Sequence, residues 1–401
     1  MKKLFCIFII TFLFACSNEK KHEGVASMQR IDLSSITFDK ALKLSSFTES
    51  VEAIPLETLP ESLIGEINKI YYRNGRYYML ITNGMTNART LVFSDTGKFL
   101  FKLDRIGQGE GEYVDMMTFA LMPNADIKVF AWGKTVTYDS IGNYLYESPM
   151  SHYAIDALTY PDGSYMVKDI NGGKNYKALY TFTQKDKEIA SLINLSPIEQ
   201  KITTTFLSYI TFSSYAGKHY FAHPHCDTIY SVDAHSATPA YYLDFGKYKV
   251  DYSNVKVEDR SVDIIKKLSQ KEHAKLGDFQ FYSDLLMLNL YFGRTSSLCF
   301  YSLKTGKFMN GVQIVDDMYF KNNAIKLTPK NLPCAIIDGY MYALISPSLL
   351  TDLYTNSKQS MSAQEWNSFK QKHATLMGLC ESISEEDNPV LLKIKLKSIS
   401  Q

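Results

Sequence analysis

The stretch KIYYRNGRYYMLI (residues 69–81), followed by TLVFSDTGKFLFKL (residues 90–103), decides the fold predicted for this chain. In each stretch, two runs rich in aromatic and aliphatic residues flank a short turn sequence, Asn74-Gly75 in the first and Asp95-Thr96-Gly97 in the second. Runs of this kind suit β-strands, and a turn sequence with Asn or Asp before Gly is typical of a tight hairpin. The two stretches together predict four antiparallel strands.

Turn signals of the same kind recur along the chain in two interleaved sets. The first set lies near residues 75, 125, 162, 217, 284 and 339, and the second near residues 97, 142, 186, 234 and 306. Successive turns of the second set are 45, 44, 48 and 72 residues apart. A period in the forties with two hairpins per period indicates the four-stranded blade of a β-propeller.

Two segments with helical character interrupt this period. One covers residues 258–276 and accounts for the long interval of 72 residues, and the other covers residues 361–380 and starts with the capping-box spacing of Ser362 and Glu365. Without them, Glu66 to Leu396 leaves room for six units. The prediction is an all-β, six-bladed β-propeller with two short helical insertions. A pair of β-sandwiches is the alternative, but it does not explain the spacing of the turns.

The two ends of the repeat region supply strands that could complete the propeller. Residues 50–57 (SVEAIPLE) and residues 390–396 (VLLKIKL) both alternate between apolar and polar positions. Pairing an N-terminal strand with the last blade removes two exposed sheet edges, which would otherwise template aggregation. We therefore expect the N- and C-terminal strands to share one blade.

The first sixteen residues have the features of an export signal. Lys2 and Lys3 precede an apolar run that ends at Ala15, and the small residue before Cys16 resembles the lipobox of bacterial lipoproteins, whose cysteine is acylated. The expected organisation is a lipoprotein signal peptide over residues 1–15, a lipidated tether and connecting segment over 16–47, and the propeller over 48–401. We expect an exported protein, anchored by lipid on Cys16 to the bacterial outer membrane, on its periplasmic face or at the cell surface.

Composition excludes one class of partner. Lys and Arg together number 43 and Asp and Glu 42, so the formal charge is +1 and no strong positive field favours nucleic acid. Four cysteines lie beyond the tether, far apart and without a Cys-x-x-Cys pair, so zinc-knuckle spacing is absent. We expect Cys299 and Cys334 to be buried thiols, and the disulfide state of the four is left open: Cys226, Cys299, Cys334 and Cys380.

Several short motifs resemble one known family. FSDTGKFL (residues 93–100) and IGQGEGEY (residues 106–113) are similar to the FDxxGKFL and IGxGPGEY signature of bacterial six-bladed β-propeller lipoproteins, with departures at Ser94 and Glu110. CDTIY (residues 226–230) is like another strand of that family. The resemblance implies an exported six-bladed propeller lipoprotein, and it implies no established reaction.

The glycine-rich motif at residues 107–111 is the first candidate site. A dinucleotide-binding loop would open directly into a helix, and no helical pattern follows, so we expect a tight crossing between blades. As speculative ligand-binding residues near this crossing we name Arg105, Glu110, Glu112 and Tyr113.

A second candidate is the sequence His223-Pro224-His225-Cys226-Asp227. If this segment is a strand, His223, His225 and Asp227 lie on one face and could bind a metal ion together. The alternative is a hairpin end with solvated histidines and Cys226 packed inside.

No motif for catalysis is present, since Gly-x-Ser-x-Gly and His-Glu-x-x-His are absent from the sequence. The expected function is therefore a non-enzymatic binding or scaffold module for a peptide, a glycan or an envelope protein, without a cofactor. The alternative is a hydrolase or lyase that depends on a divalent metal ion, such as calcium, in the propeller channel. Helical insertions slightly favour the first, because insertions on one face often form partner surfaces.

Overall fold

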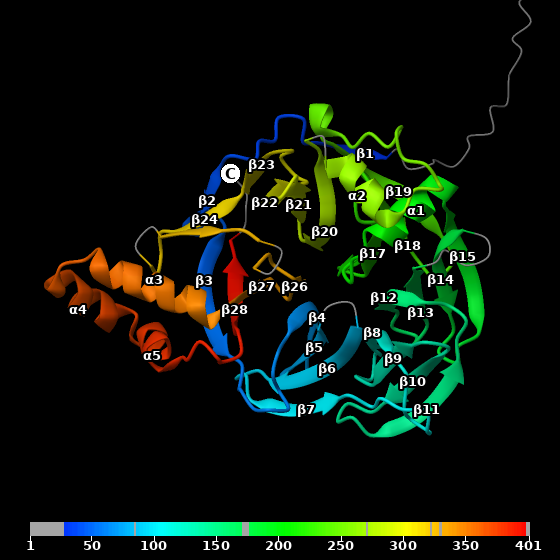
Figure 1. Cartoon of the computed structure of the whole chain (residues 1–401), viewed down its shortest axis with the longest axis horizontal. Helices are drawn as coiled ribbons and strands as arrows, with labels where there is room; N and C mark the ends of the chain where they lie inside the picture. Colours follow the sequence, from blue (N-terminus) through cyan, green and yellow to red (C-terminus); the bar gives the residue numbers. More distant parts are fainter. Residues whose placement is uncertain are drawn as a thin grey trace, which may run out of the picture.

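The structure is a computed structural model that describes residues 28–83, 86–170, 176–269, 272–320, 323–328 and 331–397. Most of its strands form four-stranded antiparallel units that stand around the centre of the molecule (Figure 1). The prediction of a β fold is confirmed in the sense that the structure is mostly β, and the arrangement is that of a β-propeller.

The sheets follow one another along the chain, and each is named by its first strand. The β4 sheet contains β4 (Glu66–Arg73), β5 (Arg76–Asn83), β6 (Thr86–Ser94) and β7 (Phe99–Leu103). The β8 sheet contains β8 (Met116–Leu121), β9 (Ile127–Ala131), β10 (Lys134–Tyr138) and β11 (Tyr144–Pro149). The β12 sheet contains β12 (Ala154–Thr159), β13 (Tyr165–Asp169), β14 (Lys177–Phe182) and β15 (Glu188–Asn194).

The remaining four-stranded sheets come from the second half of the chain and one N-terminal strand. The β16 sheet contains β16 (Phe212–Tyr215), β17 (Lys218–Phe221), β18 (Thr228–Val232) and β19 (Ala237–Asp244). The β20 sheet contains β20 (Ala274–Tyr282), β21 (Leu285–Phe292), β22 (Thr295–Ser302) and β23 (Phe308–Gly311). The β26 sheet contains β26 (Ala335–Ile337), β27 (Tyr340–Ile345), β28 (Val390–Leu396) and β3 (Thr48–Pro55).

The two sets of predicted turns have different places in these sheets. Turns of the first set join the first and second strands of a sheet, and turns of the second set join the third and fourth. Asn74 and Gly75 both have positive φ, 53° and 71°, which the tight hairpin requires and which Asn and Gly tolerate. The prediction of four-stranded hairpin units is confirmed.

In the β26 sheet the fourth strand comes from the opposite end of the chain. β3 pairs antiparallel with β28, with Ile54 opposite Leu391 and Val51 opposite Ile394. The two terminal segments therefore share one sheet, as the alternating patterns of residues 50–57 and 390–396 led us to expect.

The N-terminal segment adds strands to the sheets before it reaches β3. β1 (Gln29–Asp32) pairs parallel with β19, and β2 (Ala41–Lys43) pairs parallel with β24 (Gln313–Asp316), which also pairs with β25 (Asn323–Lys326). A short 3-10 helix, η1 (Leu44–Ser46), leads into β3. The sheets therefore begin at Gln29, upstream of the expected boundary at residue 48. Strands of three or four residues are too short to show an alternating pattern in the sequence.

Apolar side chains fill the space between each sheet and its neighbours. Tyr78 and Phe119 lie in the cluster between the β4 and β8 sheets, and both are buried. Tyr77 and Leu391 lie in the cluster that joins the β26 sheet to the β4 sheet, and neither is exposed to solvent. Successive residues point to opposite faces of a strand, so Tyr77 and Tyr78 reach two different clusters.

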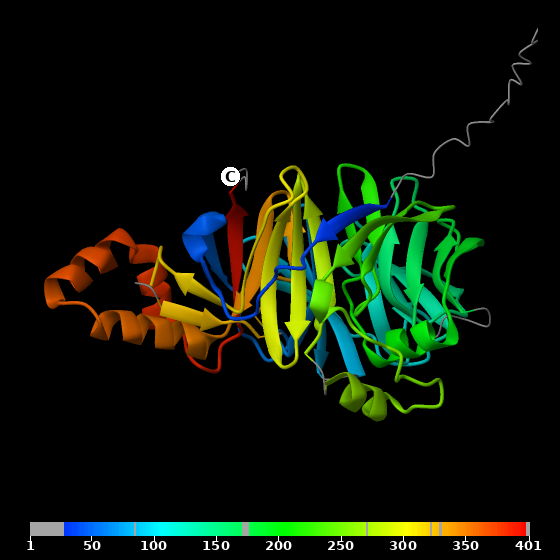
Figure 2. The same ribbon diagram turned by 90° about the horizontal axis from the view of Figure 1, so that it is seen from above.

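The helices lie in connections that follow a second or a fourth strand. Because strands alternate in direction, these connections are on the face opposite the predicted hairpin turns. Figure 2 shows the orange and red helices α3 to α5 projecting from one side of the molecule. The helical segments are α1 (Pro197–Thr205), η2 (Gly246–Tyr248), α2 (Ser261–Ser269), α3 (Pro347–Gln359), α4 (Ala363–Lys372) and α5 (Ala374–Ser382). Within the described ranges, none of them combines the length and the apolar character that a membrane crossing requires.

The helical content differs from the prediction of two short insertions. The segment 258–276 is helical only in α2, and β20 already starts at Ala274. The segment 361–380 belongs to a larger insertion that begins with α3, while α1 was not predicted at all. The missed starts carry a recognisable signal, because Ser196 and Ser346 are N-caps followed directly by proline at the first helical position.

The pairing of β3 with β28 leads to a prediction about stability. Replacing Leu391→Ala removes a fully buried side chain between two sheets, so we expect the free energy of unfolding to fall by about 2–5 kcal/mol. The matched control is Leu145→Ala on β11, where Leu145 is 46% exposed and the expected change is within about 0.5 kcal/mol. Urea unfolding measures both. Equal effects of the two substitutions would contradict the packing described.

Candidate functional site

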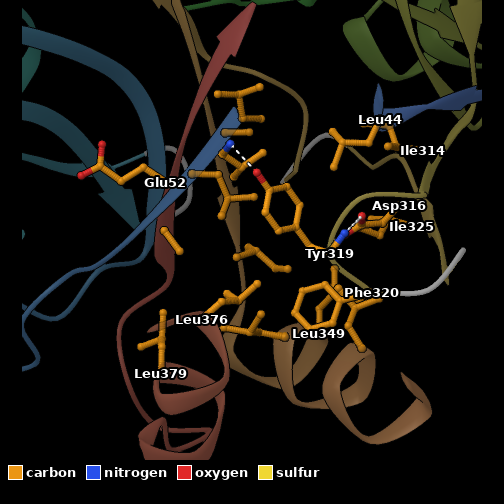
Figure 3. A pocket seen from close by; sticks show the side chains of 18 of the residues that line it. Leu44, Glu52, Ile314, Asp316, Tyr319, Phe320, Ile325, Leu349, Leu376 and Leu379 are labelled. Atoms are coloured by element: carbon orange, nitrogen blue, oxygen red, sulfur yellow. Dashed lines mark hydrogen bonds between the residues drawn. The ribbon is translucent and has the colours of Figure 1, made fainter. Parts of the chain in front are cut away.

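A mostly apolar cavity lies between the β26 sheet and the helical insertion (Figure 3). Its volume is about 600 Å³, which is within the range of ligand-binding pockets. Most of the lining is aliphatic or aromatic and comes from β3, β27, β28, α3, α5 and the β24–β25 hairpin. We call this space the insertion cavity, and the residues that define its walls in Figure 3 are Leu44, Glu52, Ile314, Asp316, Tyr319, Phe320, Ile325, Leu349, Leu376 and Leu379.

The sequence of the insertion accounts for the helical wall. Ser346 caps α3 by accepting a hydrogen bond from the backbone N–H of Leu349, and Ser362 forms a capping box with Glu365 at the start of α4. The spacing of Leu349, Leu350 and Leu353 places three apolar side chains on one face of α3. All three line the cavity, so the insertion presents an apolar surface to the sheet.

Tyr319 lies in the insertion cavity and contacts the edge of β3 (Figure 3). Its hydroxyl oxygen accepts a hydrogen bond from the backbone N–H of Val51 at 2.9 Å. The backbone N–H groups of Met318 and Tyr319 in turn donate to Oδ1 of Asp316 at 3.0 and 2.8 Å. Burial raises the pKa of the Asp316 carboxyl, and these hydrogen bonds oppose that rise. Asp316 therefore fixes the turn that carries Tyr319.

Among the strands that the structure describes, β3 is the last of its sheet, and none of them pairs with its outer edge. Antiparallel neighbours alternate between hydrogen-bonded and non-hydrogen-bonded pairs. The N–H of Val51 donates to Tyr319 rather than to β28, so Val51 is in a non-hydrogen-bonded pair, and Ala53, two residues further, has the same orientation. The backbone N–H and C=O of Ala53 therefore point away from β28, toward the outer edge of β3. Val51 and Ala53 both line the insertion cavity, so this edge lies beside the cavity.

A buried ion pair crosses the centre of the molecule. Lys69 on β4 binds Asp156 on β12, and Oδ2 of Asp156 also accepts hydrogen bonds from the backbone N–H and the hydroxyl of Thr211, at 2.6 and 2.9 Å. Burial acts against the charge on Lys69, but the Asp156 carboxylate holds its pKa above the usual value. This network joins three sheets. Because its polar groups have hydrogen-bond partners, we assign it a structural role.

Bulges position the side chains of this centre. The register of β4 shifts between Ile67 and Lys69, and that of β12 shifts between Ala154 and Asp156. A bulge redirects the side chains that follow it. β20 has the same irregularity just before Asp278.

Asp278 lies near the centre, and the pKa of its carboxyl group is strongly raised. It is half-buried beside Asn289, whose Nδ2 donates to Oδ1 of Asp278 at 2.8 Å and to the carbonyl oxygen of Pro333 at 2.7 Å. Burial raises the pKa of Asp278 from 3.8 to about 7, and the hydrogen bond from Asn289 opposes that rise. With Gly277 and Tyr291 it lines a second cavity of about 330 Å³.

The glycine-rich segment is the connection between β7 and β8, as predicted for a crossing between blades. Tyr113 is fully buried and its backbone N–H donates to the carbonyl oxygen of Arg105. Glu112 accepts a hydrogen bond from the N–H of Gly109 at 2.9 Å, within the same loop. Arg105 and Glu110 are exposed. The four speculative ligand residues therefore lie in one loop, but the structure does not bring them to either cavity described above.

The histidine-rich segment is a turn and not the strand that the metal hypothesis assumed. It connects β17 to β18, and His225 has a positive φ of 65°, so alternation along a strand does not apply. The ring of His225 stacks on Phe206 at 3.7 Å between centroids, and the ring of His223 packs edge-on against Phe221. Among the described residues, no group of three or more His, Cys, Asp or Glu side chains is placed to hold a metal ion.

The four cysteines beyond the tether are free thiols in this structure. Cys299 is buried, as expected, and Cys334 is half-buried. Burial raises the pKa of Cys226 and of Cys334 to about 12, so these thiols are poor nucleophiles at neutral pH. Cys16 lies outside the described residues.

Sequence reasoning did not identify the insertion cavity. Its walls come from segments that are far apart in the chain, and neither Tyr319 nor Ala53 belongs to a recognisable motif. The Ser-Pro pair at 346–347 is the one signal that could have revealed the full length of the insertion.

The fold and the site together define a β-propeller with a helical insertion that encloses an apolar cavity. The chain belongs to the family described as a domain of unknown function, DUF4934, whose model matches residues 28–395. A comparison with curated proteins finds no match.

Several solved structures are similar to this chain to different degrees. A crystal structure of a candidate exported protein from Bacteroides fragilis is 16% identical, with a TM-score of 0.66, and the match covers 92% of this chain and 99% of that one. A protein of unknown function from Bacteroides caccae is 9% identical, with a TM-score of 0.38 and coverage of 67% and 82%. BamB from Moraxella catarrhalis is 9% identical, with a TM-score of 0.37 and coverage of 74% and 71%. At 16% identity, the first likeness concerns the fold alone.

The perturbed acidity of Asp278 leads to a pH-dependent prediction. Its folded pKa is raised, so folding favours the protonated form, and the stability that this gives is complete below about pH 4 and is lost as the pH rises toward 7. Asp278→Asn keeps the acceptor for Asn289 and removes the charge. We expect the variant to be more stable than wild type at pH 8, by on the order of 2 kcal/mol after allowing for solvent access, and no more stable at pH 4.

The matched control is Asp352→Asn on α3, where the carboxylate is exposed. Urea unfolding at pH 4, 6 and 8 measures the difference for both variants. A stability gain for Asp278→Asn that is the same at all three pH values would contradict the burial argument.

Proposed function

We propose that this chain is an exported, lipid-anchored, six-bladed β-propeller that acts as a non-enzymatic binding module for an extended apolar peptide segment of an envelope protein. The observation that carries the proposal is the outer edge of β3 beside the insertion cavity, with which none of the described strands pairs. The peptide would add as a strand to that edge and insert alternate apolar side chains into the cavity.

The order of the sheets and their packing support the proposal of six blades and a closed ring. Five sheets take four consecutive strands each, and the β26 sheet takes three strands and is completed by β3. Apolar clusters join each sheet to the next in chain order, and a further cluster joins the β26 sheet back to the β4 sheet. A ring of six units with one shared terminal blade accounts for all of these contacts.

Export and lipid attachment are proposed from the N-terminal sequence. Lys2 and Lys3, the apolar run to Ala15 and the following Cys16 form a lipoprotein signal, and the mature chain would start at Cys16. A similar fold is found in the candidate exported protein from Bacteroides fragilis, which is consistent with export of this chain.

Peptide binding fits the chemistry of the cavity better than glycan binding. Sugars need many hydrogen-bond partners, whereas this lining is mostly aliphatic, with Leu349, Leu376 and Leu379 along the helical wall. An extended peptide instead satisfies the N–H and C=O of Ala53 through main-chain hydrogen bonds, and its alternate side chains fill apolar space. An acyl chain would use the apolar space but not the strand edge.

The alternative of a metal-dependent hydrolase or lyase requires carboxylates from several sheets to meet at one ion. Near the centre, the Asp156 carboxylate forms an ion pair with Lys69 and accepts a hydrogen bond from Thr211, and Asp278 accepts a hydrogen bond from Asn289. No observation in the described residues favours this alternative over binding.

Strand addition to β3 is tested with Ala53→Pro, which removes the outward N–H and leaves the pairing with β28 in place. Dodecapeptides selected from a random displayed library on the wild-type protein should carry alternating apolar residues. We expect Ala53→Pro to weaken their binding about fivefold, since one hydrogen bond contributes about 1 kcal/mol. Leu376→Glu, which places a charge in the cavity, should abolish binding. Fluorescence anisotropy measures the affinities.

Ala53→Gly is the matched control, because it keeps the N–H. Peptides that bind Ala53→Pro and wild type equally would contradict strand addition, and binding that Leu376→Glu leaves unchanged would contradict the insertion cavity as the site. Equal capture of free palmitate by wild type and Ala53→Pro, without peptide binding, would identify an acyl ligand instead.

The proposed anchor is tested with Cys16→Ala. In a bacterial host that processes lipoproteins, we expect wild type to incorporate radiolabelled palmitate and to sediment with membranes, because acyl chains contribute about 0.8 kcal/mol per buried methylene. The variant should carry no label and should not sediment. Labelling or membrane association that survives the substitution would show that Cys16 is not the lipid site.

A further inference from the structure

The cavity that Asp278 lines is separate from the insertion cavity and shares none of its lining residues. Its volume is about 330 Å³, which is within the range of small-molecule sites. It lies between the end of α1 with the connection that follows it, the β17–β18 turn, and the strands β20 and β21. We call this space the Asp278 cavity.

The carboxyl group of Asp278 supplies the acidic group of this lining. Its Oδ1 accepts a hydrogen bond from Nδ2 of Asn289 at 2.8 Å, and no Lys, Arg or His among the described residues forms an ion pair with it. An ionised carboxylate that is removed from water is costly unless a cation pairs with it. The cavity therefore contains a carboxyl group that lacks a counter-ion within the described part of the chain.

Aromatic rings form walls beside this carboxyl group. A Cβ atom on Gly277 would lie 2.4 Å from Cε2 of Tyr291, so the Tyr291 ring packs directly on the backbone next to Asp278. Phe206 forms another wall, and its ring stacks on that of His225 with 3.7 Å between centroids. Aromatic rings attract organic cations, and together with a carboxylate they are suited to an ammonium group.

The other polar groups around the cavity do not balance the carboxyl group. The hydroxyls of Thr205 and Ser208 each donate a hydrogen bond to a backbone carbonyl of their own segment. Burial, and then the charge of Lys275, lower the pKa of His225 to about 3, so its imidazole is neutral at pH 7. Nζ of Lys275 lies 5.9 Å from the centroid of the Phe206 ring, and burial lowers the pKa of this lysine.

A second carboxylate acts on the same cavity. Burial raises the pKa of the Tyr291 hydroxyl, and the charges of Asp278 and Glu66 raise it further. Glu66 is on β4 and is exposed. On β26, the Cys334 thiol is also influenced by Asp278, but it is protonated at neutral pH because burial raises its pKa to about 12. These carboxylates favour a positively charged ligand over an anion.

We propose that the Asp278 cavity binds a small organic ammonium ion with an apolar body. The ammonium group pairs with the carboxylate of Asp278 and donates a hydrogen bond to the Tyr291 hydroxyl, and the apolar body contacts Phe206 and Leu207. A carboxylate ligand would be repelled by Asp278 and Glu66. A divalent metal ion would find one carboxylate in the lining, which is fewer oxygen ligands than it requires.

Binding of an ammonium ion changes the protonation of Asp278. Burial raises the pKa of this carboxyl to about 7, so at pH 6 most molecules carry the proton, which leaves to solvent when the ammonium group pairs with the carboxylate. The ionised fraction rises from about one tenth at pH 6 to about nine tenths at pH 8, so the affinity rises about tenfold between them. A neutral ligand would leave the proton in place.

The proposal is tested by isothermal titration calorimetry of the whole chain with three probes that share a phenyl ring. They are phenethylamine, 2-phenylethanol, in which a hydroxyl replaces the ammonium group, and 3-phenylpropanoate, which carries a carboxylate. We expect saturable one-to-one binding of phenethylamine at pH 8 and at least tenfold weaker binding of the other two. Equal binding of phenethylamine and 2-phenylethanol, or no binding of phenethylamine at about 10 mM, would overturn the proposal.

Proton release gives a second measurement on the unaltered protein. Phenethylamine carries its positive charge at both pH 6 and pH 8, and each titration is repeated in phosphate and in imidazole, whose ionisation enthalpies differ. The difference in apparent heat gives the number of protons released. We expect about one proton per ligand at pH 6, almost none at pH 8, and an affinity about tenfold lower at pH 6. Binding without proton release at pH 6 would overturn the role of Asp278.

Variants assign the binding to this cavity. Asp278→Asn should reduce the affinity for phenethylamine at pH 8 at least tenfold and abolish the proton release at pH 6. The matched control Asp352→Asn, on the exposed side of α3, should change neither. If circular dichroism shows that Asp278→Asn is unfolded, proton release by the wild type decides the outcome. Phenethylamine binding that Asp278→Asn leaves unchanged would overturn the assignment.

A further variant separates this proposal from the peptide site. Leu376→Glu, in the insertion cavity, should leave phenethylamine binding unchanged while it abolishes peptide binding. Loss of phenethylamine binding in Leu376→Glu would overturn the Asp278 cavity as the ammonium site. The peptide proposal and the ammonium proposal can therefore fail independently.

Discussion

The pairing of β3 with β28 is the constraint on which the rest of the structure depends. It joins residues 48–55 to residues 390–396, so almost the whole chain lies between two strands that must meet. Leu391 of this pair packs against the β4 sheet, and Ile394 packs against the β20 sheet. Without the pairing, the β26 sheet would lose its fourth strand and two sets of apolar contacts would be exposed together.

The outer edge of β3 carries backbone N–H and C=O groups that do not pair with any of the described strands. One side of β3 pairs with β28. On the other side, within the described part of the chain, Val51 alone has a hydrogen-bond partner, the hydroxyl of Tyr319. Exposed strand edges are normally covered or charged. Here the helical insertion stands over the edge but leaves a cavity of about 600 Å³ between them, which is why we regard the edge as a binding surface rather than a packing defect.

Local sequence predicted the hairpins well, because Asn-Gly, Asp-Gly and related turns act within a few residues. Asn74-Gly75 and Asp338-Gly339 both join the strands expected of them. The insertion cavity depends on contacts between distant residues, such as Tyr319 with Val51, and no local pattern encodes these. The metal hypothesis at His223 was wrong about the strand because a positive φ at His225 turns the chain there.

The most direct test of the shared terminal sheet is an engineered disulfide between Val51→Cys and Ile394→Cys. These positions form a non-hydrogen-bonded antiparallel pair, whose Cα separation of about 4.5 Å suits a disulfide. We predict that the bond forms on mild oxidation and that mass spectrometry of a non-reduced digest finds the two terminal peptides linked within one chain. Two thiols that remain reduced, or that link only different molecules, would contradict the account.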